Sequence, residues 1–293
     1  MKNVGFVGLG DMGMGMAKNL MDKGFSVIGH DLKESLCKEL IAASGECAVD
    51  CKTVGATCKT VFVMVMNGQQ VKDVVTELCS ELEAGSTIIV TATIHPAQIK
   101  EAELITRDHG VELIDSPVSG GLPGSIDGSL TLMVAAKTEI LLRHRAELEA
   151  ISANIFHVGQ TIGSGQTVKA ALQAYIGASY AAIFESLVLG SKAGISGKVL
   201  YDVFSTSSAA SPLFENCAKL IMDRKFENTG SQIATMYKDL GITMNMGKEK
   251  GVPLFTTAAA FELFLAGNNQ FPNGDNWSIV KTLEQLSDTQ VTW

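Results

Sequence analysis

The feature that most constrains the fold is a glycine-rich loop between a short apolar run and a helical pattern. The stretch GFVGLGDMGMG contains the spacing G-x-G-x-x-G at Gly8, Gly10 and Gly13. The first glycine permits a tight turn, the second lets backbone N–H groups approach a pyrophosphate, and the third lets the helix pack closely on the strand. The start of the helix adds unpaired donors and partial positive charge. An ordinary strand–helix turn could carry the same glycines, so the surrounding pattern decides.

That pattern favours a dinucleotide. A second predicted strand ends at Asp31, and a carboxylate there can accept both ribose hydroxyls of NAD while repelling the 2′-phosphate of NADP. No arginine follows directly, although Lys33 could partly favour NADP. We therefore expect NAD rather than NADP, and we expect the Asp11 carboxylate to point into solvent. The predicted cofactor loop consists of Gly8, Leu9, Gly10, Asp11, Met12 and Gly13.

Up to about residue 160, short β-branched runs alternate with longer segments of helical periodicity. Runs such as VFVMVM and IIVTA are continuously apolar, as strands covered on both faces are. The alternation predicts an α/β fold with a doubly wound, mostly parallel sheet. The predicted strands are 4–8, 25–31, 60–66, 87–93, 111–117, 129–135 and 155–158, and the predicted helices are 14–23, 33–42, 69–83, 96–109 and 138–152.

After Gly165 the pattern is purely helical, with predicted helices at 166–194, 197–204, 211–223, 231–250, 252–266 and 276–287. Gly194, Gly251 and Gly267 stand where helices should stop. We predict a dinucleotide-binding domain over 1–162 and an all-α domain for substrate binding and oligomerisation over 163–293. The segment 163–194 is predicted to be a long interdomain helix.

The composition excludes several classes of protein. Hydrophobic residues make up 46% of the chain and charged residues 18%, which argues against disorder. The net charge is −8 and no run of Lys and Arg exceeds two residues, so a nucleic-acid partner is disfavoured. The segment 170–195 is apolar enough to suggest a membrane span, but it contains Gln173, Glu185 and Lys192. We expect no membrane association, no signal peptide at the MKNVGFVGLG start, and a cytoplasmic location.

The six cysteines do not predict a metal site. They stand at positions 37, 47, 51, 58, 79 and 217, with no C-x-x-C pair and no histidine at zinc-ligand spacing. Cys47 and Cys51 could pair or bind a metal, but buried thiols in a reducing cytosol are the expected state.

Two further segments suggest a substrate site. One predicted strand ends in the segment Asp115-Ser116-Pro117-Val118-Ser119-Gly120-Gly121. A hydroxyl followed by two glycines offers hydrogen-bond donors to a carboxylate, although a plain glycine-rich turn has the same sequence pattern. Lys169 lies on the first full turn of the long helix, with Gln173 four residues on. Partial loss of solvation there should lower the pKa of the lysine and suit it to acid/base work, but spacing alone equally fits a surface lysine.

Taken together the chain resembles the β-hydroxyacid dehydrogenase family, which includes 3-hydroxyisobutyrate, tartronate semialdehyde and threonate dehydrogenases. The resemblance covers nearly the whole chain. It is carried by GFVGLGDMGMGMAKNL, VMVMNGQQV, TATIHP, DSPVSGG, GSGQTVK and YKDLGI, in family order. It implies a Rossmann-type domain and a helical domain joined by the long helix, assembled as a homodimer or homotetramer, with a small carboxylate as substrate.

The resemblance also implies roles for individual residues. Lys169 would be the acid/base catalyst, and Ser119, Gly120 and Gly121 would hold the substrate carboxylate. The remaining roles concern the cofactor and the pocket: Thr93 would lie near the nicotinamide ribose, Val65 and Met66 along the cofactor, Lys238 near the nicotinamide and the substrate, and Gln173 near the substrate's reacting end.

The sequence departs from the family pattern in places. Gln173 replaces the Asn of the 3-hydroxyisobutyrate member, and 64–66 reads Met-Val-Met where Met-Leu-Pro is usual. These changes, with Leu-Phe-Glu-Asn at 213–216 and the segment at 276–281, look more like the threonate-type branch for four-carbon acid sugars. Leu172 stands where Asn or His is common.

Three alternatives remain to be weighed. An imine reductase would share the cofactor loop, but such relatives replace the lysine, so Lys169 argues against it. A non-catalytic cofactor-binding homologue would not need an intact lysine and carboxylate loop, so their presence argues against this alternative. A short-chain dehydrogenase is excluded, because none of the four tyrosines is followed by Lys four positions later.

Overall fold

The computed structural model describes residues 2–293, which fall into two compact units. The first ends at Lys169 and contains the sheet, and the second, Ala170–Trp293, is helical. This confirms the predicted α/β class with an all-helical second part. The division falls inside the long helix α9 (Ser164–Lys192), so the start of that helix belongs with the sheet.

The first unit is built on a nine-stranded sheet with the order β3-β2-β1-β4-β5-β6-β8-β7, and β9 also pairs with β8. Its strands are β1 (Asn3–Val7), β2 (Ser26–His30), β3 (Glu46–Cys47), β4 (Thr60–Val63), β5 (Thr87–Val90), β6 (Glu112–Asp115), β7 (Val118–Ser119), β8 (Leu130–Ala135) and β9 (Ser152–Gly159). Neighbours from β3 to β6 are parallel, and β8 is antiparallel to β6 and β7. The chain leaves β1 toward β2 and returns on its other side at β4, which makes the β1/β4 boundary the switch point of a doubly wound sheet.

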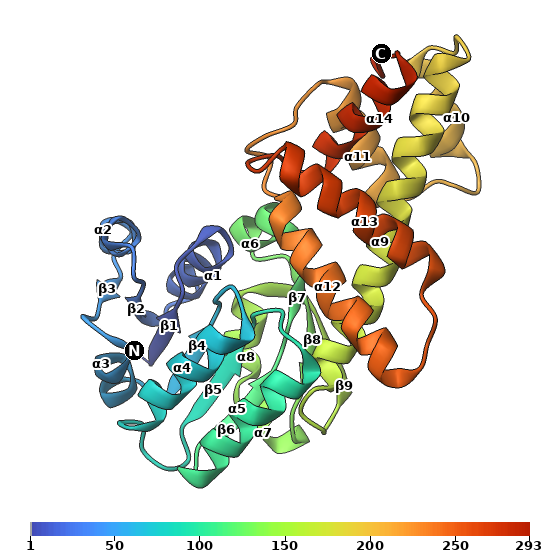
Figure 1. Cartoon of the computed structure of the whole chain (residues 1–293). Coiled ribbons are helices and arrows are strands. Elements are labelled where there is room, and N and C mark those ends of the chain that lie inside the picture. Colours follow the sequence, from blue (N-terminus) through green and yellow to red (C-terminus); the bar gives the residue numbers. More distant parts are fainter. Residues whose placement is uncertain (1) are drawn as a thin grey trace. The chain divides into compact units, whose positions relative to one another are not determined.

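Helices cover both faces because the strands are apolar on both sides. In β4, Phe62 points into one hydrophobic core while Val61 and Val63 point into the other. The helices of the first unit are α1 (Asp11–Asp22), α2 (Glu34–Ala42), α3 (Cys51–Thr57), α4 (Gly68–Cys79), α5 (Pro96–Asp108), α6 (Gly121–Asp127), α7 (Thr138–Arg143) and α8 (Arg145–Ala150). In Figure 1, α4 and α5 lie side by side over the sheet.

The second unit packs its helices around one core. The helices are the main part of α9, then α10 (Gly197–Thr206), α11 (Pro212–Met222), α12 (Ile233–Lys250), α13 (Phe255–Gln270), the 3₁₀ turn η1 (Asn276–Ile279) and α14 (Val280–Ser287). Gly194, two residues after the end of α9, and Gly251, directly after α12, have positive φ, as predicted for helix stops. Gly267 does not end a helix: it lies inside α13, where a Cβ would come within 2.5 Å of the Ile279 side chain.

Helix α9 is the one described helix that is long and apolar enough to cross a membrane. The core helix of a globular protein meets the same criteria, and α9 has the contacts of one. The hydroxyl of Thr243 on α12 donates to the carbonyl of Ala170 at 3.0 Å. Farther along, a Cβ on Gly177 would clash with Leu240, so the two helices approach closely at that glycine. These contacts pack one face of α9 against α12, while Tyr175 and Leu189 of the same helix are exposed.

The cysteine prediction is right for four positions and wrong for two. Cys51, Cys58, Cys79 and Cys217 are buried free thiols, and burial raises the pKa of the Cys58 and Cys79 thiols to about 11. Cys37 and Cys47, in contrast, form a disulfide between α2 and β3. The pairing depends on the two-residue strand β3, which the sequence pattern did not reveal.

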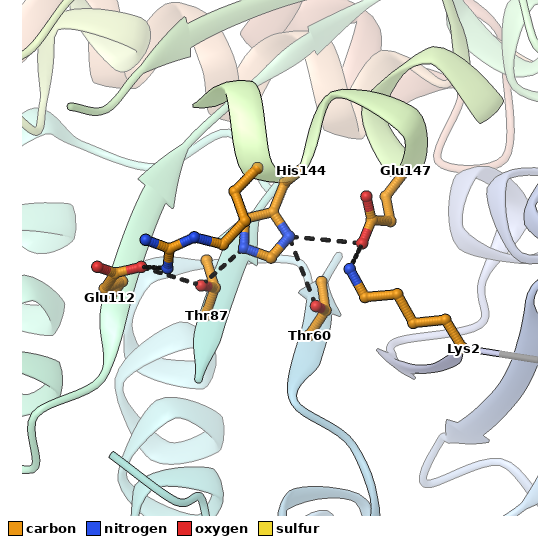
Figure 2. Close-up of polar contacts among 7 residues, drawn as sticks. Lys2, Thr60, Thr87, Glu112, His144 and Glu147 are labelled. Carbon is orange, nitrogen blue, oxygen red and sulfur yellow. Dashed lines mark hydrogen bonds and ion pairs between the residues drawn. The ribbon is translucent and has the colours of Figure 1, made fainter. Parts of the chain in front are cut away.

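A buried polar network closes the amino-terminal edge of the sheet. Figure 2 shows His144 between Thr60 and Thr87, which begin β4 and β5, and beside Glu147 of α8. Lys2, directly before β1, forms an ion pair with Glu147. Burial acts to raise the pKa of Glu147, but the hydrogen bonds from His144 and Lys2 outweigh it and lower the pKa to about 2.

This network predicts an acid-sensitive contribution to stability. Because the pKa of Glu147 is lower in the folded chain than its ordinary 4.5, its contribution is present above pH 4.5 and is lost as the pH falls toward 2. Glu147→Gln should therefore lower the free energy of unfolding at pH 7 by about 3 kcal/mol and flatten its pH dependence below 4.5. Denaturant titrations at several pH values measure both effects. The matched control is Glu149→Gln, which breaks an exposed pair with Arg145 on the same helix and should change little. A Glu147→Gln chain with the wild-type slope would contradict the assignment.

Candidate active site

The glycine-rich loop has the geometry that a pyrophosphate needs. Gly8 has φ +93°, and a Cβ there would lie 2.1 Å from the Met64 carbonyl oxygen. A Cβ on Gly13 would lie 1.9 Å from the Gly8 carbonyl oxygen, so the turn and the helix contact require both glycines. Gly10 differs, because nothing lies within 4 Å of its Cβ position. The open side of the loop is thus at Gly10, where the backbone can approach a phosphate.

Asp31 directly follows β2 and is tied to this loop. Its Oδ2 accepts the N–H of Leu9 at 2.8 Å, and its Oδ1 accepts the N–H of Lys33 at 2.8 Å. Each carboxylate oxygen can still accept a further hydrogen bond, as two ribose hydroxyls would require. The contact with Leu9 also fixes the distance between the carboxylate and the phosphate loop.

The other predicted cofactor residues follow neighbouring strands at the same edge of the sheet. Val65 and Met66 follow β4, and Thr93 follows β5. The Met66 N–H donates to Gln70 on α4 at 2.9 Å, which fixes the turn after β4. Asp11 is exposed as expected and begins α1, and Met12 is half-buried beside it. Because parallel strands present their carboxyl ends at one edge, these residues share the crevice where ligands of such sheets bind.

The predicted carboxylate loop lies at the next strand. Ser119 ends β7, and Gly120 and Gly121 have φ of +131° and +60° at the start of α6. These left-handed conformations favour glycine and leave the backbone of the turn exposed. A serine hydroxyl and accessible N–H groups are therefore present together, as an anion would require.

The structure reveals two organising residues that the sequence interpretation did not assign. Asp115 ends β6, is fully buried, and accepts N–H groups from the start of α9: Gly163 at 2.8 Å, Gly165 at 3.0 Å and Gln166 at 3.4 Å. The Gln166 amide donates to Asp115 and to the Ala92 carbonyl, both at 3.0 Å. The two residues lie in the segments DSP and GSGQ, which are recognisable in the sequence. Their role becomes clear only from the contact between them, which joins residues 51 positions apart.

The same amide holds the loop that carries Thr93. Gln166 Oε1 accepts the N–H of Ile94 at 3.0 Å, so residues on both sides of Thr93 are bonded to one side chain. Lys169 lies three residues later on α9, is buried, and forms part of the same unit. The Asp115–Gln166 pair thus sets the start of the lysine helix against the loop after β5.

Asp115 is an unusual carboxylate because no cation pairs with it in the described contacts. Burial raises the pKa of its carboxyl to about 6, and the N–H groups of Gly163, Gln166 and Gly165 only partly offset that effect. Four donors around one buried carboxylate favour the ionised form near neutral pH. Above about pH 6 the ionised Asp115 therefore keeps its hydrogen bonds to Gly163, Gly165 and Gln166. We call these bonds, with those of the Gln166 amide, the clamp.

The remaining predicted residues belong to the second unit. Gln173 is buried on α9, one helical turn after Lys169, and its amide donates to Asp239 Oδ2 at 2.6 Å. Lys238 on α12 is partly buried and its ammonium lies 3.0 Å from Asp239 Oδ1. The structure thus brings Gln173 and Lys238 together on one carboxylate, that of Asp239, to which the sequence interpretation gave no role.

Comparison with known proteins agrees with this arrangement. Residues 3–159 match the family described as the NAD-binding domain of 6-phosphogluconate dehydrogenase, and residues 163–283 match the family described as NAD-binding of NADP-dependent 3-hydroxyisobutyrate dehydrogenase. The 2-(hydroxymethyl)glutarate dehydrogenase of Eubacterium barkeri is 31% identical over 99% of this chain and 97% of its own length. The chain belongs to the β-hydroxyacid dehydrogenase family. It is a nicotinamide-dependent oxidoreductase that acts on CH–OH groups.

Two further members show the same similarity over the full length. The L-threonate dehydrogenase of Escherichia coli strain K12 is 31% identical over 97% of this chain and 96% of its own length. The crystal structure of a 3-hydroxyisobutyrate dehydrogenase from Salmonella typhimurium is 29% identical, with a TM-score of 0.87 over 96% of this chain and all of that one. Imine reductases are more distant: the enzyme from Streptomyces aurantiacus is 16% identical with a TM-score of 0.68, a likeness of fold alone.

The clamp predicts that Gln166 is essential for local stability. Gln166→Ala removes two donors and one acceptor from a buried position, and it leaves the Ile94 N–H and the Ala92 carbonyl unpaired. We expect the free energy of unfolding to fall by about 2–4 kcal/mol. Thr167→Ala is the matched control, because the neighbouring hydroxyl is exposed and bonds only within its own turn. Thermal and denaturant unfolding measure the difference, and equal effects of the two substitutions would rule out the clamp.

Proposed function

We propose that this protein is an NAD-dependent dehydrogenase of a small hydroxy acid, with Lys169 as the acid/base catalyst. The observation that carries the proposal is the placement of a buried lysine on α9, whose start is hydrogen-bonded to the end of β6 and to the loop of Thr93. A lysine held there is at the edge of the sheet where the dinucleotide loop also lies. The nicotinamide, when bound, accepts or donates the hydride.

The proton chemistry falls to Lys169. In oxidation the carbinol C–H bond breaks as the hydride leaves, the C=O bond forms, and the hydroxyl proton passes to the neutral amine of Lys169. In reduction the ammonium returns that proton to the oxygen. One lysine thus serves both directions, and burial keeps bulk water away from the proton transfer.

The substrate's carboxylate is assigned to the loop of Ser119, Gly120 and Gly121. The exposed backbone and the hydroxyl support this assignment, because they supply donors without introducing a large side chain. We also assign Lys238 to the region near the nicotinamide and the substrate anion. The relatives named after 2-(hydroxymethyl)glutarate and L-threonate also act on carboxylates, which supports a small carboxylate as the substrate class.

The preference for NAD over NADP is assigned to Asp31. The side chain follows β2 and is held to the phosphate loop through Leu9, the place where the adenosine ribose of a bound dinucleotide lies. A negative charge at that point repels a 2′-phosphate. Lys33, whose N–H also bonds to Asp31, is a cation at this point that would favour NADP.

The assembly and location are proposals of the same kind. Several large apolar side chains of the second unit are exposed, among them Leu189 (73%) and Tyr175 (66%) on α9 and Phe255 (83%) on α13. Apolar surface of this kind supports a homodimer or homotetramer that buries it. We place the protein in the cytoplasm, where NAD and small hydroxy acids are available.

Removal of the catalytic amine should abolish the reaction. Lys169→Ala should lower kcat by ~100-fold or more, because general acid/base catalysis contributes at least that factor, and should leave NADH binding intact. Steady-state rates with a panel of C3–C6 hydroxy acids and fluorescence titration with NADH measure the two effects. Lys192→Ala, at the exposed end of the same helix, is the control and should behave as wild type. A Lys169→Ala enzyme with more than a tenth of the wild-type rate would refute the assigned role.

The cofactor assignment makes a separate prediction. Asp31→Asn keeps a side-chain oxygen that can accept the Leu9 N–H but removes the charge, so the ratio of kcat/KM for NAD to that for NADP should fall at least about tenfold. Asp22→Asn removes an exposed charge at the end of α1 and should leave the ratio unchanged. An unchanged ratio in Asp31→Asn, or a wild-type enzyme that prefers NADP, would show that Asp31 does not select the cofactor.

A further inference from the structure

Helix α6 carries the assigned carboxylate loop but is too short to fix it in place by itself. It spans Gly121–Asp127, and isolated helices shorter than about 12–15 residues are only marginally stable in water. Gly120 before it and Gly128 after it have positive φ, so the chain turns sharply at both ends. Figure 1 shows α6 beside α1, against which it packs. The position of the carboxylate loop therefore depends on what joins α6 to its neighbours.

Asn19 of α1 completes the carboxyl end of α6. The last four carbonyls of a helix have no partner within it. The Gly124 carbonyl accepts the N–H of Ser129 at 2.9 Å. The Asn19 amide donates to the next two carbonyls, those of Ser125 at 2.7 Å and Ile126 at 3.2 Å. One side chain of α1 thus satisfies acceptors that α6 cannot satisfy itself.

A second contact joins α6 to the dinucleotide loop. Ser125 is fully buried, and its hydroxyl donates to the carbonyl of Met12, a residue of that loop, at 2.5 Å. The two helices approach closely here, because a Cβ on Gly15 would lie 2.3 Å from the Ser125 hydroxyl oxygen and 2.7 Å from its carbonyl oxygen. The Asn19 amide also donates to the Gly15 carbonyl at 2.9 Å, which holds it between the helices. The loop at the start of α1 and the loop at the start of α6 are thus joined through two side chains.

The separation of these two loops matters for hydride transfer. When bound, the dinucleotide is placed by the first loop, and the substrate carboxylate is assigned to the second. Hydride transfer requires the two reacting carbons in near-attack geometry, and a misplacement of about 1 Å can lower the rate about 100-fold. Loosening α6 from α1 would leave the dinucleotide loop intact, since Gly8, Gly13 and Asp31 hold it through contacts of their own. The substrate alone would lose its anchor.

We propose that Asn19 and Ser125 are positioning residues that hold the carboxylate loop at a fixed distance from the dinucleotide loop, so that recognition of the substrate's carboxylate depends on α1. The inference rests on the proposed function, which assigns the carboxylate to Ser119, Gly120 and Gly121. It adds to that site the contact between α1 and α6, which acts through the loop and not on the substrate directly.

The test compares a hydroxy acid with the same molecule without its charge. 3-Hydroxyisobutyrate and glycerate are each assayed with NAD beside their methyl esters, and any C3–C6 acid that is oxidised faster is assayed in the same way. Hydrogen bonds to a charged group contribute about ten- to a hundredfold, so the wild-type enzyme should prefer each acid over its ester by at least about tenfold in kcat/KM. The preference is a ratio measured on one enzyme sample, so partial unfolding of a variant cancels from it.

Two substitutions remove the contact from opposite sides. Asn19→Leu keeps the size of the side chain but removes the amide, and the preference for the acid should fall about tenfold, chiefly through a higher KM for the acid. Ser125→Ala removes one neutral hydrogen bond and should lower the preference about fivefold. The Kd for NADH, from fluorescence titration, should be unchanged in both. Lys18→Gln is the matched control, because it removes an exposed ion pair with Glu39 from the same helix and should change neither quantity.

Hydrogen exchange gives a measurement that does not depend on turnover. In both variants the amides of 120–128 should exchange about tenfold faster than in the wild-type chain, because α6 opens more often once its contact with α1 is weakened. The amides of β4 and β5 should keep their wild-type rates, which shows that each variant is folded.

Other results would overturn the inference at different points. If both variants lower kcat for acid and ester alike and leave KM unchanged, the contact is structural only. If the Kd for NADH rises while the preference stays as in the wild type, the contact serves the dinucleotide loop. If the wild-type enzyme oxidises acid and ester equally, the carboxylate loop is wrongly assigned although the dehydrogenase assignment stands. If no C3–C6 hydroxy acid is oxidised at all, the proposed function fails and the inference fails with it.

Discussion

The interaction on which the site depends is the buried hydrogen-bond clamp between Asp115 and Gln166. A parallel sheet gathers the loops after its strands at one edge, but it does not by itself fix a helix that starts beyond the last of those loops. Asp115 supplies that fixed point by accepting three backbone N–H groups at the start of α9. Gln166 extends it to the backbone on both sides of Thr93. The position of Lys169 follows from these contacts, because a helix transmits the geometry of its first turn to the next.

A buried carboxylate lies at each end of the parallel strands, and the pKa values of the two shift in opposite directions. At the amino edge, Glu147 has Lys2 and His144 as partners, and their attraction exceeds the cost of burial, so the pKa falls to about 2. At the carboxyl edge, Asp115 has only neutral N–H donors, burial prevails, and the pKa rises to about 6. The first arrangement serves stability over a wide pH range. The second makes the ionisation of Asp115 depend on neutral hydrogen-bond donors at the start of α9.

The sequence predicted those parts of the fold that depend on local chemistry. Continuous apolar runs located the parallel strands, and the spacing of Gly8, Gly10 and Gly13 located the phosphate loop, because tight turns leave few residues to choose from. The two-residue strands β3 and β7 and the short helices α3 and α6 were missed, since such elements have too few residues to show a period. The interpretation of Gly267 as a helix stop was wrong because a glycine also serves where another side chain, here Ile279, packs against a helix. Asp115, Gln166 and Asp239 could not be assigned beforehand, because the hydrogen-bond partners described above lie 48 to 74 residues away along the chain.

Helix α9 begins in the first unit and continues in the second. Lys169 ends the first unit, where Asp115 and Gln166 set the start of the helix, and Gln173 belongs to the second, where Asp239 sets its amide. A substitution at Gln173 therefore removes its hydrogen bond to Asp239 and leaves the contacts of Asp115 and Gln166 in place. The replacement of Asn by Gln keeps an amide that can donate to a carboxylate, and it adds one methylene of reach. In physical terms, separate buried carboxylates hold the first turn of α9 and the turn of Gln173, so the side chain at position 173 can change in length without a change in the contacts that fix the start of the helix.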